Sequence, residues 1–158
     1  MSGHEGVTIA RVAAPLHQVS ARRGVDLGLR PGRAAPFGDG LALCFALDTA
    51  IVVGARPDLP PERAAAVDQS GGLAMLRLAG PAAAEVLSRG CRLDLHPAAF
   101  PPGSVARTPI AQVAVILYRA EATTFDILVP ATFAHSFEHF LLAAAAPFGC
   151  ALLPAESP

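Results

Sequence analysis

The alternation of apolar and polar positions is clearest in the second half of the chain. Residues 73–80, LAMLRLAG, alternate well enough to predict a strand that ends at Gly80. Pro81 stands where a helix begins, a position at which the missing N–H of proline is harmless. The following segment, PAAAEVLSR, is rich in strong helix formers and predicts a helix that stops at Gly90.

A second group of elements follows a long loop. Residues 111–121, AQVAVILYRAE, are apolar on both faces and rich in β-branched residues, so they predict a central strand. After the short polar gap EATT, residues 125–130, FDILVP, predict the hairpin partner of that strand. The run CALLP at 150–154 is a further short apolar segment.

A helix is predicted between the hairpin and this last segment. Its apolar positions recur at helical spacing, while its polar positions lie off that stripe. The apolar set is Phe133, Phe137, Phe140, Leu141 and Ala144, and the polar set is His135, Glu138 and His139. The helix is expected to stop at Pro147 to Gly149.

The order over residues 66–154 is therefore strand, helix, long loop, strand, strand, helix and strand. This is the ferredoxin-like split β-α-β order. We predict the α+β class, with two helices on one face of an antiparallel sheet.

The first sixty-five residues carry a weaker pattern. Residues 7–14 predict a strand, and residues 30–40 a loop because of their prolines and glycines. Residues 41–54 predict two short apolar strands that turn at Asp48 and Thr49. Residues 55–65 hold three prolines and predict a linker or a short capped helix. With 158 residues in all, we expect one domain over 1–158.

Composition leaves two interpretations open. Apolar residues make up 53% of the chain and charged residues 16%, against a typical charged share of about 25%. A surface with so little charge favours apolar patches, which usually mark partner interfaces. The other interpretation is that alanine, a weak hydrophobe, inflates the count.

Charge and cysteine usage exclude several classes. The net charge is −1 and no basic run is denser than ARR at 21–23, so nucleic-acid binding is not expected. Residues 139–155 lack Asp, Glu and Arg but are interrupted by Pro147 and Gly149, so no membrane span is expected. The first residues do not resemble a signal peptide. Three cysteines without a CxxC pair indicate no disulfide framework and a reduced, cytoplasmic location.

Cys91, Asp68 and Ser70 are the first candidates for chemistry. Cys91 follows the C-terminal end of a predicted helix, where the dipole opposes a thiolate, so a buried apolar cysteine is favoured over a reactive one. Asp68 and Ser70 precede a strand, where they are more typical of an Asx turn than of a serine nucleophile.

Two histidine arrangements complete the candidates. His135 and His139 have the i, i+4 spacing of a zinc pair, but no third ligand is identified and a solvated polar face is favoured. Asp94, His96 and Arg107 can converge, although a loop histidine beside proline is more often a surface residue. A glycine-rich dinucleotide fingerprint is not present. We therefore assign no catalytic, cofactor-binding or metal residue.

A longer stretch of the chain resembles a known family. The run GC.LDLHP..F.PG at 90–103, within residues 66–149, resembles the gamma subunit of heterotetrameric sarcosine oxidase. The order of Asp68, Ser70, Gly80 and Pro81 is similar to that of the folate-binding fold of the glycine-cleavage T-protein and TrmE. Compared with the family, the region 1–65 is shortened.

The resemblance implies a non-catalytic subunit. The complex would oxidise sarcosine to glycine, with formaldehyde or methylene-tetrahydrofolate and hydrogen peroxide as the other products. FAD, FMN, NAD, zinc and tetrahydrofolate are implied for the partner subunits, and the main partner is the alpha subunit, with beta and delta in the same assembly. The alternatives are a stand-alone folate-binding or one-carbon-transfer protein of the aminomethyltransferase type, and a thiol or metal enzyme.

Overall fold

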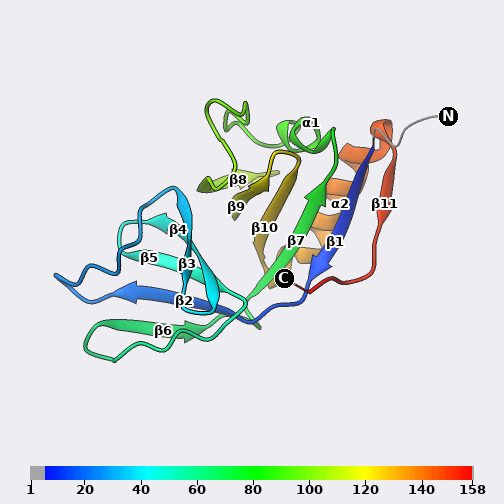
Figure 1. Ribbon diagram of the computed structural model, residues 1–158. Helices are drawn as coiled ribbons and strands as arrows, with labels where there is room; N and C mark the ends of the chain where they lie inside the picture. The colour runs from blue at the N-terminus through cyan, green and yellow to red at the C-terminus, as the bar shows by residue number, and fades with distance from the viewer. Residues whose placement is uncertain (1–5, 158) are drawn as a thin grey trace.

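Two β-sheets and two α-helices form three layers in the computed structural model, which describes residues 6–157 (Figure 1). The larger sheet, sheet A, has the strand order β11-β1-β7-β10-β9-β8. Its strands are β1 (Val7–Val12), β7 (Leu73–Ala79), β8 (Val105–Ile110), β9 (Val113–Glu121), β10 (Thr124–Pro130) and β11 (Cys150–Leu152).

The helices α1 (Ala83–Ser88) and α2 (Ala134–Ala145) lie together on one face of sheet A (Figure 1). Alternate residues of the strands point toward them, among them Leu76, Leu117 and Ile127, all fully buried. On α2 the buried stripe includes Phe137 and Leu141, as the spacing predicts. The helix layer and this face of sheet A thus share one core.

Phe133 departs from the predicted stripe. It precedes α2, in the short 3-10 turn Ala131–Phe133, and is 49% exposed. The tighter turn changes the direction of its side chain relative to the helix, and Ala134 takes the buried position instead.

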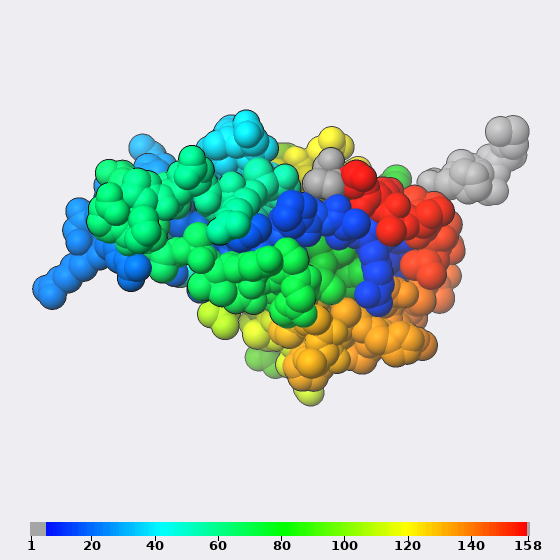
Figure 2. Space-filling view, turned by 90° about the horizontal axis from the view of Figure 1, so that it is seen from below, coloured from blue at the N-terminus to red at the C-terminus, as the bar shows by residue number. Residues whose placement is uncertain are grey.

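The other face of sheet A packs on a second sheet, sheet B. The sequence predicted two of its strands, in residues 41–54 with a turn at Asp48 and Thr49, but not the sheet as a whole. Its strand order is β3-β4-β5-β2-β6. The strands are β2 (Leu16–Ala21), β3 (Arg33–Phe37), β4 (Gly40–Ala46), β5 (Thr49–Val53) and β6 (Ala64–Asp68). Met75 and Leu128 of sheet A meet Leu43 and Ile51 of sheet B between the layers. Sheet B forms a lobe at one end of the molecule (Figure 2).

The ferredoxin-like order is confirmed, with two further strands in the sheet: β8 is added at the edge beside β9, and β1 is inserted. Strands β7, β9, β10 and β11, with α1 after β7 and α2 after β10, follow the split β-α-β order along the chain. In the sheet, however, β1 lies between β7 and β11, pairing antiparallel with β7 and parallel with β11. The N-terminal strand therefore completes the sheet that the second half of the chain begins.

Two prolines mark strands that were expected to be loops. Pro36 lies in β3 and Pro109 in β8, and each strand is at the edge of its sheet. A proline cannot donate to a neighbouring strand, but an edge strand needs donors on one side only. The predicted linker at 55–65 likewise ends in β6, which begins at Ala64 and is another edge strand. None of the helices within residues 6–157 is long and apolar enough to cross a membrane.

Candidate functional site

The Asp68–Ser70 pair is a turn that joins the two sheets. The backbone N–H of Ser70 donates to Asp68 Oδ1 at 2.8 Å, which is an Asx turn, as predicted. That hydrogen bond is the main reason that the pKa of Asp68 is lowered from its ordinary value. Ser70 Oγ accepts from the Leu16 N–H at 3.0 Å and so fixes the start of β2. The Ser70 hydroxyl thus contacts the backbone of Leu16 and helps to position β2.

The loop after α1 is organised by its own polar residues. Asp94 Oδ1 accepts from the backbone N–H of His96 at 3.0 Å, and His96 Nδ1 accepts from the N–H of Ala98 at 3.1 Å. Arg107 lies over the Phe45 ring, 5.9 Å from its centroid, and the structure gives it no contact with the other two. The loop therefore contains two local turns in place of the Asp94, His96 and Arg107 site that the sequence left open.

Cys91 begins this loop and is buried, as predicted. It forms an isolated bridge with Ile110 and belongs to the core beneath the helices. Gly90, next to it, explains the specific sequence of the run: a Cβ here would lie 2.7 Å from Phe140 Cζ and 3.0 Å from the Ala111 nitrogen. The absence of a side chain at Gly90 thus allows the end of α1 to approach α2 closely.

Arg119 is the polar residue of this region that the sequence analysis missed. It is 4% exposed, and its Nη1 donates to the Leu95 and Phe100 carbonyls, both at 2.8 Å. Its Nε and Nη2 donate to the Ala122 carbonyl at 3.1 and 2.7 Å, and the guanidinium carbon lies 4.9 Å from the Phe125 ring centroid. The available signal was an arginine inside the apolar run VILYRAE. Arg119 holds the long loop against sheet A.

An ion-pair network lies on the face of sheet A that turns away from the helices. Arg77 donates to both oxygens of Asp126, at 2.8 and 3.1 Å, and reaches Glu156 at 3.3 Å. Burial raises the pKa of Asp126 although the arginine opposes the rise. Burial and, to a smaller extent, the charge of Asp126 raise the pKa of Tyr118, its neighbour on β9. The network attaches the segment after β11 to the centre of the sheet.

The histidine pair of α2 is a solvated polar face, as favoured. His135 and His139 are exposed, with ring centroids 4.5 Å apart. Glu138 lies between them in the chain but pairs with Arg11 at 3.0 Å. Residues 6–157 bring together no group of three or more histidine, cysteine, aspartate or glutamate side chains that could hold a metal ion.

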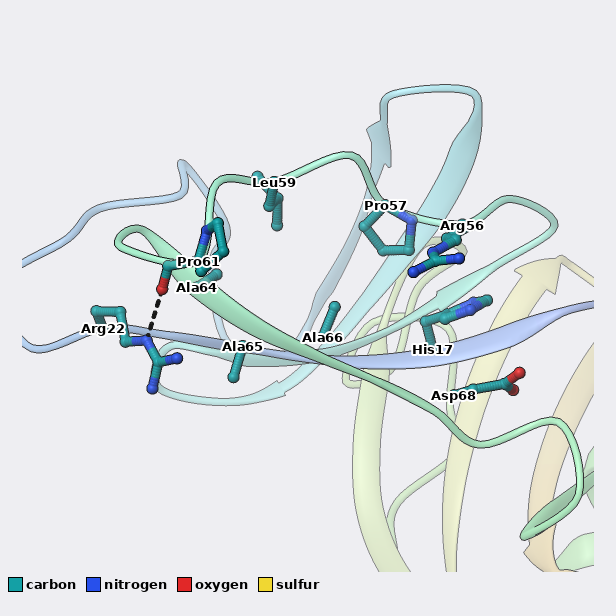
Figure 3. Close-up of a pocket in the computed structure, with 10 residues that line it drawn as sticks. All are labelled: His17, Arg22, Arg56, Pro57, Leu59, Pro61, Ala64, Ala65, Ala66 and Asp68. Carbon is teal, nitrogen blue, oxygen red and sulfur yellow. Dashed lines mark hydrogen bonds between the residues drawn. The ribbon is translucent and has the colours of Figure 1, made fainter.

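A pocket of about 470 Å³ lies on the outer side of sheet B (Figure 3). His17 of β2 and Asp68 of β6 are cross-strand partners in its lining, and Arg56 enters from the loop after β5. Arg22 lines the opposite end. His17 is 8% exposed, and its buried Nδ1 has no hydrogen-bond partner among the described residues. The sequence analysis does not single out His17, which lies in the mixed polar and apolar segment LHQVSA of β2.

Comparison with known proteins decides what kind of chain this is. Residues 49–147, more than half of the chain, match the family described as "Sarcosine oxidase, gamma subunit family". The chain belongs to that family. Curated members that it resembles are sarcosine oxidase gamma subunits from Corynebacterium sp. strain U-96, 36% identical over 85 residues, and strain P-1, 37% identical over 82 residues. These matches cover 54% and 52% of this chain and only 42% and 40% of the relatives.

The structural likeness extends further than the sequence likeness. A chain of the heterotetrameric sarcosine oxidase from Corynebacterium sp. U-96, solved with pyrrole 2-carboxylate, is 25% identical and matches with a TM-score of 0.80. That match covers 97% of this chain and 90% of the other. The glycine cleavage system aminomethyltransferase T from Bartonella henselae, 14% identical, matches with a TM-score of 0.62 over 95% of this chain and 49% of its own. The gamma-family chain therefore has the T-protein-like fold that the resemblance implied.

Proposed function

We propose that this chain is the non-catalytic gamma subunit of a heterotetrameric sarcosine oxidase, acting in the cytoplasm as a single gamma-like domain. The observation that supports this most directly is the fold match over nearly the whole length of both chains, this one and a chain of the solved heterotetrameric enzyme. It includes β2, β3 and β4 of sheet B, which precede residue 49, where the family match begins.

In the proposed assembly, the chemistry takes place on other subunits. Sarcosine, oxygen and water become glycine, formaldehyde and hydrogen peroxide, and tetrahydrofolate can take the one-carbon unit instead of its release as formaldehyde. Flavins, NAD and zinc would belong to the partners, chiefly alpha, with beta and delta. The donor set of this chain does not suit zinc, because Cys44, Cys91 and Cys150 are separate and no three-ligand group forms within residues 6–157.

The role left to this chain is that of a rigid docking partner, which carries no catalytic, cofactor-binding or metal residue. Its strand β11 is at the edge of sheet A and displays Leu152, 55% exposed, and the next residue, Leu153, is 37% exposed. Edge strands with exposed apolar side chains are prone to associate with other chains. We take this edge, the β11 edge, as part of the surface that meets the alpha subunit.

Co-expression with the flavoprotein subunits of a heterotetrameric sarcosine oxidase tests the proposal. We expect the chain to co-elute with a yellow, flavin-absorbing complex, and its deletion to reduce the yield of assembled oxidase. Elution of this chain alone, together with undiminished oxidase activity after deletion, would contradict it.

The alternative, a stand-alone folate-binding protein, has its own test. Folinic acid at millimolar concentration should leave the thermal unfolding temperature of the isolated chain unchanged if the chain is only a docking subunit. A saturable rise, combined with failure to co-elute, would favour one-carbon transfer over the gamma-subunit assignment.

A further inference from the structure

The pocket on the outer side of sheet B has the chemistry of a binding site that the subunit role does not require. Its volume of about 470 Å³ is within the range of about 300–1,000 Å³ that is usual for small-molecule sites. One wall is the loop that carries Pro57 and Leu59, and the floor is the alanine run of β6 (Figure 3). The body of a ligand would therefore meet apolar surface.

His17 supplies a directed donor at one end of this pocket. The side chain is more than nine-tenths buried, and Nδ1 has no partner among residues 6–157. A hydrogen on Nδ1 would be a buried donor without an acceptor, which we take to cost more free energy than an Nδ1 without a hydrogen. If Nδ1 carries no hydrogen, a neutral imidazole has its one N–H on Nε2, the other nitrogen of a ring that lines the pocket.

The charges around the pocket favour an anion. Arg22 and Arg56 contribute two positive charges and Asp68 one negative, so the lining carries a net charge of +1 with His17 neutral; Arg56 and Asp68 lie at the His17 end, where Asp68 opposes an anion, and Arg22 lies at the other end. Arg22 donates from Nε to the Pro61 carbonyl at 2.9 Å. The three ion pairs among the described residues involve Arg11 and Arg77, so neither arginine of the pocket forms one of them. The guanidinium of Arg56 is thus available beside the imidazole of His17 (Figure 3).

We propose that this pocket binds a small organic carboxylate, with the carboxylate on His17 Nε2–H and Arg56 and an apolar body against β6. Guanidinium and imidazole N–H groups are the donors that carboxylates prefer. The proposal does not depend on the gamma-subunit role, because the site is complete within this chain.

Benzoate is the probe, and benzamide, of the same shape without the charge, is its control. In the isolated full-length chain labelled with ¹⁵N, we expect benzoate to give saturable shifts of the His17 imidazole and of the β6 amides, and benzamide to give none. A long-range ¹H–¹⁵N spectrum should show the Nε2–H tautomer. An Nδ1–H tautomer, no saturable shift up to about 10 mM benzoate, or an equal response to benzamide would overturn the proposal.

Three exposed-residue variants keep the test independent of folding. We expect Arg56→Gln to weaken benzoate binding about threefold or more, and Asp68→Asn to tighten it by a similar factor. Arg92→Gln, an exposed arginine beyond the pocket, should leave binding unchanged. Weakening by Arg92→Gln equal to that by Arg56→Gln would reduce the effect to net charge and refute a built site. Loss of the benzoate response after assembly with partner subunits would also refute the small-molecule assignment, since a partner would then occupy the pocket.

Discussion

Replacing Arg119 by methionine tests whether a single buried side chain holds the 89–104 loop. Methionine keeps most of the aliphatic volume but removes every N–H donor. The carbonyls of Leu95 and Phe100 are then buried without this partner, while that of Ala122 is only partly buried. An unsatisfied buried acceptor costs about 1–3 kcal/mol, so two of them cost about 2–6 kcal/mol.

Relief from burying a cation offsets part of this cost, because Arg119 has no acidic partner. We therefore expect Arg119→Met to lower the free energy of unfolding by about 3 kcal/mol, a large part of a typical total of about 5–15 kcal/mol. Urea unfolding followed by circular dichroism measures the loss.

The control for this experiment is Arg92→Met, which removes an exposed arginine from the same loop. It should change the free energy of unfolding by less than about 0.5 kcal/mol. Hydrogen exchange adds a local measurement: the Gly103 amide, which donates to the Arg119 carbonyl at 2.7 Å, should lose protection in Arg119→Met. A loss below about 1 kcal/mol with unchanged protection would refute the assigned role.

Three further outcomes follow from the structure. Because burial raises the pKa of Asp126, its carboxyl group keeps a proton in the native state at pH values where the unfolded state has lost it. The contribution of Asp126 to the free energy of unfolding should therefore fall as the pH rises above 3.8, the ordinary value for aspartate. Asp126→Asn should remove this pH dependence, which urea unfolding at a series of pH values measures. Leu152→Glu combined with Leu153→Glu should weaken co-elution with the flavin subunits by at least about tenfold, because the exposed parts of the two leucine side chains are worth about 1.5–3 kcal/mol when a partner buries them. Leu47→Glu changes a residue that is 76% exposed on sheet B and should leave co-elution unchanged. Equal effects of the two changes would argue against the β11 edge as a docking surface. Gly80→Ala should lower the thermal unfolding temperature of the isolated chain, because φ at this position is +133° and the new Cβ would lie 2.3 Å from a backbone oxygen. An unchanged unfolding temperature would show that a shift of the backbone relieves this close approach.

The parts of the fold that the sequence predicted are those with strong local patterns. Strand β7 and helix α1 follow from alternation, a proline and a terminal glycine, and α2 follows from its apolar stripe. Strands β3 and β8 did not, because proline signals a break in the chain but is tolerated at a sheet edge. β6 did not either: its sequence AAAVD has little β-propensity, and pairing with β2 makes it a strand.

Among the candidate sites, too, the sequence predicted only the features that depend on neighbouring residues in the chain. The Asx turn at Asp68 and the burial of Cys91 depend on neighbours in sequence, and both were predicted. The roles of Arg119 and His17 depend on contacts with distant segments: the carbonyls that Arg119 holds include one 24 residues away, and His17 meets β6 across the sheet. A polar residue at an inward position of a strand is the signal to look for in such cases.

The position of β1 between β7 and β11 has a consequence for how the molecule is made. β1 leaves the ribosome before the other strands of sheet A, yet one of its two neighbours, β11, is synthesised after all of them. Until β11 and the residues up to Glu156 emerge, the first strand has an open edge, and closing it requires contacts between segments more than 140 residues apart, such as Val7 with Cys150. Completion of the larger sheet must therefore wait until β11 has been synthesised, so that a nascent chain stalled before β11 leaves one edge of β1 unpaired.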